Sequence, residues 1–108
     1  MRFTGARGTA SVRVRAPAVA AGRTVTFHVW LPAGNGLDAI QAYVQEGPSG
    51  RWRYTAAWRD AQRLPPGAWS AVEVRVPPDA VAPLYELGVE FRARGGWTGM
   101  AYVDSVRW

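Results

Sequence analysis

The sequence predicts an all-β protein, an antiparallel β-sandwich of about seven to eight strands. Three observations predict this fold class. Apolar and polar residues alternate with period 2 over several short runs, turn-forming clusters of Gly, Pro and Asn separate these runs roughly every ten to fifteen residues, and no segment carries the apolar stripe of an amphipathic helix. At 108 residues, the chain is expected to form one domain with its own hydrophobic core.

The first three strands are predicted at residues 10–15, 23–31 and 39–45, with a stop at Pro32 because proline cannot donate to a ladder. In the second of them, alternate residues from Val25 to Leu31 face the core. In the third, Ile40, Ala42 and Val44 point inward, and the opposite face carries Gln41, Tyr43 and Gln45.

Four more strands are predicted after residue 50. Residues 52–59 and 69–76 each alternate, and Val72, Val74 and Val76 face inward in the second of these. The last two runs flank Gly95-Gly96, which predicts a hairpin with Trp97 at its tip. The alternation breaks near Asp104-Ser105, which predicts a bulge there. The core residues expected from these two runs are Leu87, Val89, Phe91, Ala101, Val103, Val106 and Trp108.

Composition narrows the function classes. The chain has no cysteine, which excludes disulfides, thiol nucleophiles and thiolate zinc sites, and no apolar run is long enough to span a membrane. The formal charge of +5 comes from arginines scattered singly along the strands, which favours a solvated surface over a track for nucleic-acid phosphates. The start of the chain lacks the apolar region of a signal peptide. We expect a module cut from a longer, secreted protein, and therefore an extracellular location.

Several phrases of the sequence resemble a known family. They are VTFHVWLPAGNGLDAIQAYVQEG, WRYTAAWRDAQRLPPGAWSAVEVRVP, PLYELGVEFRARGGWTG and AYVDSVRW, in that order. Together they resemble the β-sandwich carbohydrate-binding modules appended to bacterial mannanases and glucanases, most closely the family 16 group with its galactose-binding-like jelly roll. The resemblance covers residues 24–108. It implies a ligand of the β-1,4-linked mannan, glucomannan or cellulose type and a covalently linked glycoside hydrolase as partner.

The same resemblance bears on calcium and on the start of the chain. Modules of this kind commonly hold a structural calcium between an acid in an initial strand and an aspartate in the closing strand. Asp104 matches the closing position, but residues 1–9 contain no acid, so they are expected to be a truncated or degenerate first strand. Residues 1–108 are thus expected to form a single module that requires no cofactor, with calcium at Asp104 as an open alternative.

A sugar site needs aromatic rings for the C–H face of a pyranose and planar polar groups for its hydroxyls. Stacked rings contribute about 0.5–1.5 kcal/mol beyond area burial, and amides both donate and accept hydrogen bonds. Trp97 is the first candidate because a loop tip gives its ring little core to join. The other candidates, each also interpretable as a core or plain surface residue, are Gln41, Tyr43, Gln45, Trp52 and Trp58. Tyr54 shares the face of Trp52 and Trp58 but is expected in the core.

Catalysis is not expected. Glycoside hydrolysis needs two facing carboxylates, and Glu86 and Glu90, on one strand face, stand about 13 Å apart at the standard rise. The predicted function is therefore non-catalytic binding of a polysaccharide or oligosaccharide by a monomer. Two alternatives stay open: an OB-like barrel that binds nucleic acid through aromatics and arginines, and a sandwich whose aromatic face packs on a neighbouring domain.

Overall fold

The structure is a computed structural model, which describes residues 2–4, 8–15, 17–93, 95 and 97–108. Its strands and two single-turn 3₁₀ helices occur in the order β1 (Arg2–Thr4), β2 (Gly8–Arg15), β3 (Thr24–Trp30), β4 (Leu37–Glu46), η1 (Pro48–Gly50), β5 (Tyr54–Ala56), β6 (Arg59–Asp60), η2 (Ala61–Arg63), β7 (Trp69–Arg75), β8 (Leu84–Ala93), β9 (Thr98–Met100) and β10 (Tyr102–Arg107).

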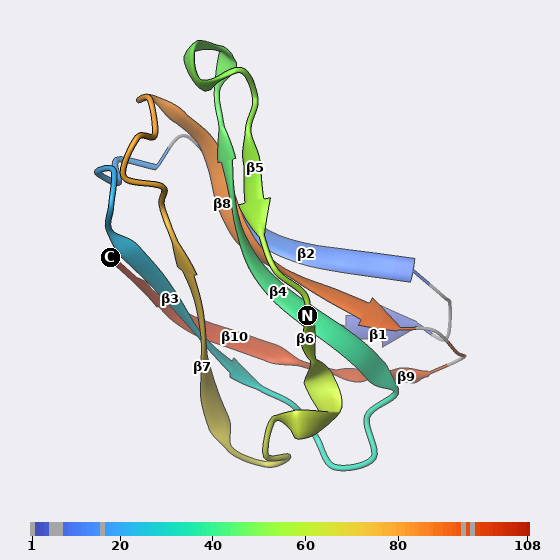
Figure 1. Cartoon of the computed structure of the whole chain (residues 1–108). Helices are drawn as coiled ribbons and strands as arrows, with labels where there is room; N and C mark the ends of the chain where they lie inside the picture. The colour runs from blue at the N-terminus through green and yellow to red at the C-terminus, as the bar shows by residue number, and fades with distance from the viewer. Residues whose placement is uncertain (1, 5–7, 16, 94, 96) are drawn as a thin grey trace.

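These strands form two facing antiparallel sheets, so the chain is a β-sandwich as predicted (Figure 1). One sheet has five strands in the order β2-β8-β4-β5, with β6 also paired to β4. The other has three strands in the order β10-β3-β7, and a short ribbon of β1 and β9 extends beyond it. Two separate sheets are not the closed barrel that the OB-like alternative requires.

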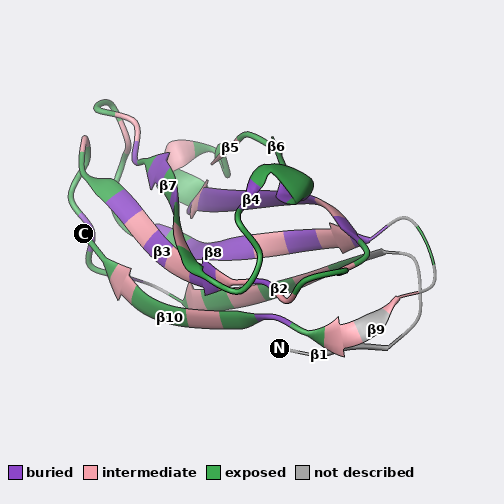
Figure 2. Ribbon diagram, turned by 90° about the horizontal axis from the view of Figure 1, so that it is seen from below, coloured by how far each residue is buried: buried purple, intermediate pink, exposed green. Residues whose placement is uncertain are grey.

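The core lies between the two sheets and follows the predicted alternation. Phe27 from β3 and Phe91 from β8 are fully buried, as are Ile40 and Val44 from β4. Strands β4 and β8 are buried along most of their length, because the two strands lie inside the larger sheet (Figure 2). The period-2 pattern therefore identified the inner faces of both sheets.

Bulges interrupt the β4–β8 ladder near both of its ends. Leu37 pairs with Ala93 and Ala39 with Arg92, so Asp38 is an extra residue on β4. At the other end Gln45 pairs with Glu86 and Glu46 with Leu84, so Tyr85 is the extra residue on β8. A bulge redirects a side chain that regular alternation would place elsewhere. Both extra residues contribute to the surface described below.

The predicted C-terminal hairpin is wrong. β8 pairs with β2 and β4, whereas β9 pairs with β1 and β10 pairs with β3. The chain therefore crosses from one sheet to the other between β8 and β10, and Gly96, half of the predicted turn, lies outside the described residues. A Gly-Gly turn between alternating runs fits such a crossover as well as a hairpin, and local sequence does not distinguish the two.

Smaller predictions had mixed outcomes. The bulge near Asp104-Ser105 is confirmed, since the register shifts there and Ser105 has a φ of 44°. The single strand predicted at 52–59 is wrong, because Trp52 lies in a turn and regular pairing is interrupted at residues 57–58 between β5 and β6. Trp108 was expected in the core but is exposed, because it follows the last ladder pair at the end of the chain.

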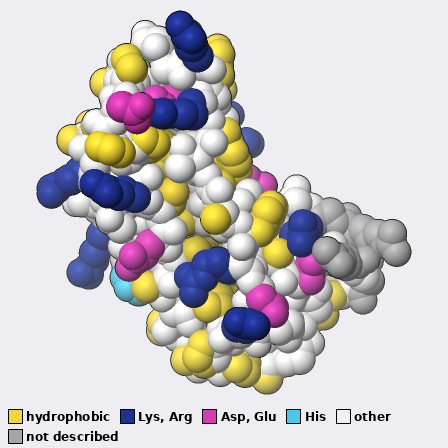
Figure 3. All heavy atoms as spheres, viewed as in Figure 1, with side chains coloured by type: hydrophobic (Ala, Val, Ile, Leu, Met, Phe, Trp, Pro, Cys, Tyr) yellow, Lys and Arg dark blue, Asp and Glu magenta, His cyan; other side chains and the backbone are white. Residues whose placement is uncertain are grey.

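Charges of both signs are interspersed over the surface. Figure 3 shows arginine side chains spread singly, with acidic side chains between them. This is the distribution that the sequence predicted. Within the described part of the chain, no helix is long and apolar enough to cross a membrane.

Candidate functional site

The outer face of the larger sheet, called here the five-stranded face, carries the predicted polar row of β4. The register places Gln41 opposite Glu90, Tyr43 opposite Gly88 and Gln45 opposite Glu86. All three β4 side chains therefore lie on one outer face. Gln41 and Tyr43 are nevertheless 4% and 3% exposed. They lie beneath other side chains rather than at the surface, which the sequence did not predict.

Tyr43 is held by hydrogen bonding across three strands. Its Oη donates to Oε2 of Glu86 at 2.5 Å, and Oε1 of Glu86 lies 3.1 Å from Nε of Arg15 on β2. Burial, followed by the hydrogen bond and the charge of Glu86, raises the pKa of Tyr43 well above the ordinary 10.0. The phenol stays protonated and keeps donating at any physiological pH.

Tyr54 on β5 completes this network. Its ring stacks on that of Tyr43, with centroids 5.3 Å apart and an interplanar angle of 23°. Its hydroxyl donates to Glu90 and accepts from Nε2 of Gln41 at 3.2 Å. Partial burial and then the hydrogen bond to Glu90 raise its pKa as well. We call the layer formed by Gln41, Tyr43, Glu86 and Glu90 the polar floor.

Gly88 gives the Tyr43 ring its place on the sheet. It lies opposite Tyr43 in the ladder, and a Cβ at this position would come within 2.8 Å of both Cε1 and Oη of Tyr43. Only a residue without a side chain lets the phenol lie close over β8. The polar floor therefore requires a glycine at position 88 as well as its four polar side chains.

Four aromatic side chains stand exposed over or beside the polar floor. Trp52 is 50% exposed, Tyr54 46%, Trp58 40% and Tyr85 39%. We call this set the ring strip. The interpretation of Trp52 and Trp58 as core residues is therefore excluded, and the expectation that Tyr54 is buried is wrong. β5 is a three-residue edge strand, so the side of Tyr54 that faces away from Tyr43 remains open to solvent.

Arginines flank each end of the ring strip. At one end, the ring of Tyr85 meets Trp52 edge-on with centroids 5.2 Å apart, and the Arg15 guanidinium lies 4.9 Å from the Tyr85 centroid. At the other end, the Arg92 guanidinium lies 4.9 Å from the centroid of Trp58. Cations over ring faces orient the rings while leaving the other side free.

The surface is hollowed at both ends of the strip. A depression of about 420 Å³ lies beside Trp58 and is also lined by Asp38 and Arg92, which form an ion pair at 3.1 Å. A second, more apolar depression of about 370 Å³ lies beside Tyr85. Ligand sites combine such hollows with a few placed polar groups. The bulges at Asp38 and Tyr85 thus shape the two ends.

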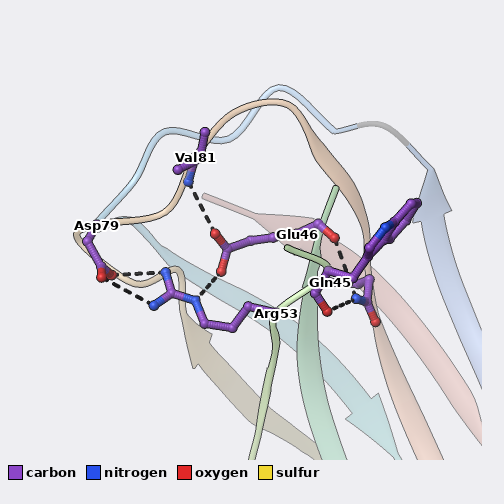
Figure 4. A network of polar contacts seen from close by, with 6 residues as sticks. Gln45, Glu46, Arg53, Asp79 and Val81 are labelled. Atoms are coloured by element: carbon purple, nitrogen blue, oxygen red, sulfur yellow. Dashed lines mark hydrogen bonds and ion pairs between the residues drawn. The ribbon is translucent and has the colours of Figure 1, made fainter. Parts of the chain in front are cut away.

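A polar network fixes the loop that carries Trp52 (Figure 4). Glu46, 1% exposed, contacts Nε of Arg53 and accepts from the backbone N–H of Val81 at 3.2 Å. Arg53 also pairs with Asp79 through both terminal nitrogens, at 2.9 and 3.2 Å. These contacts raise the pKa of Arg53 and lower that of Asp79. They tie the β4–β5 connection to the loop before β8.

Gln45 anchors the same loop from the sheet. It is half-buried, and its amide Nε2 donates to the backbone carbonyl of Trp52. Trp52 itself has a φ of 58°, and Arg51 before it has a φ of 57°, so the chain turns sharply there. Gln45 therefore positions an exposed ring instead of presenting its own amide fully to the surface.

Trp97 is half-buried rather than fully exposed at a tip. Its ring packs against the hydrophobic core and lies against the backbone of Gly36 and Gly99, where no side chain would fit. Gly36 immediately precedes the end of β4 that carries Asp38, so Trp97 lies at the same end of the sandwich as Trp58 and Arg92. Its part in ligand binding remains a prediction.

Asp104 lies away from this surface, on β10 of the smaller sheet. It is exposed, and its Oδ1 accepts from the backbone N–H of Ser105 at 2.9 Å, so it stabilises the bulge. Among the residues that the structure describes, no group of three or more His, Asp or Glu side chains is arranged to hold a metal ion. Calcium binding at Asp104 stays a prediction.

Sequence reasoning missed the partners contributed by neighbouring strands. Glu86 and Glu90 were weighed only as catalytic acids, but both accept hydrogen bonds from tyrosines of the floor and strip. Their spacing of four on one strand, matching the spacing of Gln41 and Gln45, was the available signal. The sequence around Tyr85 gave no such signal, because the orientation of this side chain depends on a bulge that alternation alone does not reveal.

Comparison with solved structures supports the same family of folds. The chain superimposes on a structure described as a study of the promiscuous specificity of carbohydrate-binding modules from the β-sandwich superfamily, with a TM-score of 0.81 and 25% identity over 99% of this chain. It has the fold of a β-sandwich carbohydrate-binding module. This chain spans 44% of the length of that one. No family model and no curated protein matches the sequence.

Proposed function

We propose that this chain is a non-catalytic module that binds a neutral polysaccharide along the five-stranded face. One observation carries the proposal: four exposed rings stand at the rim of a buried polar layer. Because these rings are 39–50% exposed, they bury only part of their apolar surface in the fold. A cluster of exposed apolar side chains marks an interaction site. Their arrangement with flanking amides, carboxylates and arginines suits the apolar faces and hydroxyl rims of sugar rings.

The ligand proposed is a β-1,4-linked chain of the mannan, glucomannan or cellulose type. The segment that carries the ring strip follows β4 from the partner of Gln45, Tyr54, to the partner of Ile40, Arg59, which corresponds to on the order of 17 Å. A surface of this length with a hollow at each end accommodates a run of several sugars. Scattered charges of both signs favour an uncharged chain. The sequence resemblance and the fold similarity both support a carbohydrate ligand.

We further propose that the module belongs to a larger secreted glycoside hydrolase. The matched solved chain is more than twice as long as this one, which is consistent with a module that accompanies other structure. Such a module acts by effective concentration, keeping an enzyme near an insoluble substrate without changing the chemical step. Binding by the isolated chain is the part of this proposal that can be tested directly.

The test is affinity electrophoresis in native gels containing glucomannan, galactomannan, hydroxyethylcellulose or xylan, with and without calcium. Retardation of the wild type that is reduced in Trp58→Ala and Trp52→Ala supports the proposal. Trp97→Ala, run alongside, reports whether that ring contributes. Trp108→Ala is the matched control, since it removes an equally exposed indole at the chain end. A wild type that no polysaccharide retards would overturn the proposal.

A further inference from the structure

A second set of exposed rings lies on the opposite side of the sandwich. In the three-stranded sheet, the register places Tyr102 of β10 directly opposite Trp30 of β3, and Trp30 opposite Trp69 of β7. These three side chains therefore form one row across the outer face of that sheet. We call it the aromatic rung. Trp30 and Tyr102 meet edge to face with centroids 5.6 Å apart.

The two outer rings of the aromatic rung are as exposed as those of the ring strip. Tyr102 is 46% exposed and Trp69 is 52% exposed, while Trp30 between them is half-buried. Ser70, the neighbour of Trp69 in sequence, faces inward because it pairs with core residue Val29, so Trp69 faces outward. The packing of the sandwich thus does not require these large rings on its outer surface.

The size of this face limits what it binds. Three strands spaced about 4.8 Å apart and about seven residues long present a surface on the order of 14 by 24 Å, or roughly 340 Å². A stable protein–protein interface buries about 800 Å² on each partner. The face by itself is therefore smaller than a stable protein interface, whereas its length and width match a narrow, extended ligand.

The groups next to the aromatic rung suit hydroxyls rather than a charged ligand. The next outward rung contains Asp104, His28 and Ala71 in register across the same strands. Farther along, Arg107 and Glu73 flank Thr26 on the same outer side. Arg75, which lies opposite Thr24, adds a second arginine to balance the two acids, so the face has no strong electrostatic preference, and its exposed polar groups offer hydrogen bonds beside the rings.

We propose that the outer face of β10-β3-β7 is a second glycan-contacting surface, with Trp69 and Tyr102 stacking on sugar rings. The inference rests on the proposed function, because it assigns a second surface for the same class of ligand. The two surfaces lie on opposite sides of the sandwich, so one module contacts two chains at once. Loss of one stacked ring is expected to weaken binding at this face about two- to tenfold.

The test follows the indole N–H signals of the ¹⁵N-labelled module during titration with a β-1,4-mannohexaose and a β-1,4-glucohexaose. Single Trp→Phe variants assign Trp30, Trp52, Trp58 and Trp69. Shifts of the Trp69 and Trp30 signals that persist in Trp58→Ala support the second surface. Shifts confined to Trp52 and Trp58 overturn it and leave the proposed function standing. Shifts confined to Trp30 and Trp69 support the second surface and overturn the five-stranded site.

A second measurement excludes other occupants. The wild type and the variants Trp69→Ala and Tyr102→Ala are compared by analytical ultracentrifugation and by their ability to cross-link soluble glucomannan, measured as light scattering. The second surface predicts a monomer whose cross-linking is reduced in both variants. A dimer that these variants dissociate would overturn the glycan assignment in favour of self-association. Circular dichroism of the variants checks that they remain folded.

Discussion

On the five-stranded face, the ring of Tyr54 stacks on a buried tyrosine whose hydroxyl donates to Glu86. On the three-stranded face, Tyr102 and Trp69 stand on either side of Trp30, and Tyr102 meets Trp30 edge to face. Both faces expose large rings, but only the first has a polar layer beneath them. A ring fixed by hydrogen bonds and stacking presents one orientation to a ligand. The comparison suggests that selectivity belongs to the first face and that the second adds contact with less discrimination.

The largest effect on the five-stranded face is expected from a substitution within the polar floor. In Gly88→Ala, the new methyl group would collide with the ring of Tyr43 and with the backbone carbonyl oxygen of Val12, and overpacking of this kind costs about 1–3 kcal/mol. Urea denaturation should show that loss, together with weaker polysaccharide retardation. Gly95→Ala is the control, because no atom lies within 4 Å of its added Cβ. Equal stability of the two variants would mean that Tyr43 does not depend on Gly88.

Removal of the outer rings separates binding from folding. The double variant Trp52→Ala/Trp58→Ala should lose about 1–3 kcal/mol of polysaccharide binding, or roughly 5- to 150-fold, if each ring contributes as a stacked pair. Its melting temperature should stay near that of the wild type, since both rings are 40% exposed or more. Isothermal titration calorimetry measures the first and a thermal melt the second. A double variant that binds as the wild type does would place the ligand elsewhere.

Alkaline pH should weaken the contribution of the five-stranded face to stability. Because folding raises the pKa of Tyr43 and Tyr54 above 10.0, the unfolded chain releases these protons first as pH rises. Stability is therefore complete below pH 10 and falls above it, by up to about 1.4 kcal/mol per pH unit for Tyr43 and by less for the half-exposed Tyr54. Denaturant titrations at increasing pH measure this slope. It should be smaller in Tyr43→Phe, which lacks the hydroxyl that titrates.

The smallest effect is expected at the edge of the first face. Asp79→Asn removes one partner of Arg53 but leaves the buried Glu46 in place. Exposed ion pairs contribute little, so the melting temperature should hardly move at neutral pH. Because Arg53 lowers the pKa of Asp79, its contribution is present above that group's ordinary pKa and is lost as pH falls. A melt at low salt that showed a large loss would reveal a stronger link to the Trp52 loop.

Much of the fold followed from alternation, and the reason is physical. Val25, Phe27 and Val29 are buried and Gln41, Tyr43 and Gln45 share an outer face because successive side chains in a strand point to opposite sides. The sandwich and the polar row were therefore predictable. The pairing of β8 with β4 was not, because it joins segments that are distant in sequence. Without that pairing, the partners of Tyr43 stayed hidden.

The exposed fraction of a side chain was harder to predict than the face of the sheet to which it points. Tyr43 and Tyr54 differ in burial although both belong to the five-stranded face, because β4 is inside the sheet and β5 is at its edge. Trp97 was expected in the open, but the crossover between the sheets brings its ring onto the core and against two glycines. The position of a strand within its sheet decides these outcomes, and local sequence does not encode that position.

The two bulges in the β4–β8 ladder give this module a means to diversify. Asp38 and Tyr85 are single inserted residues at opposite ends of one ladder, and regular pairing of Ala39 to Gln45 continues between them. Gain, loss or replacement of either residue would reshape one end of the surface without shifting the register at its centre. Related modules could thus acquire new preferences at their termini while inheriting an unchanged middle.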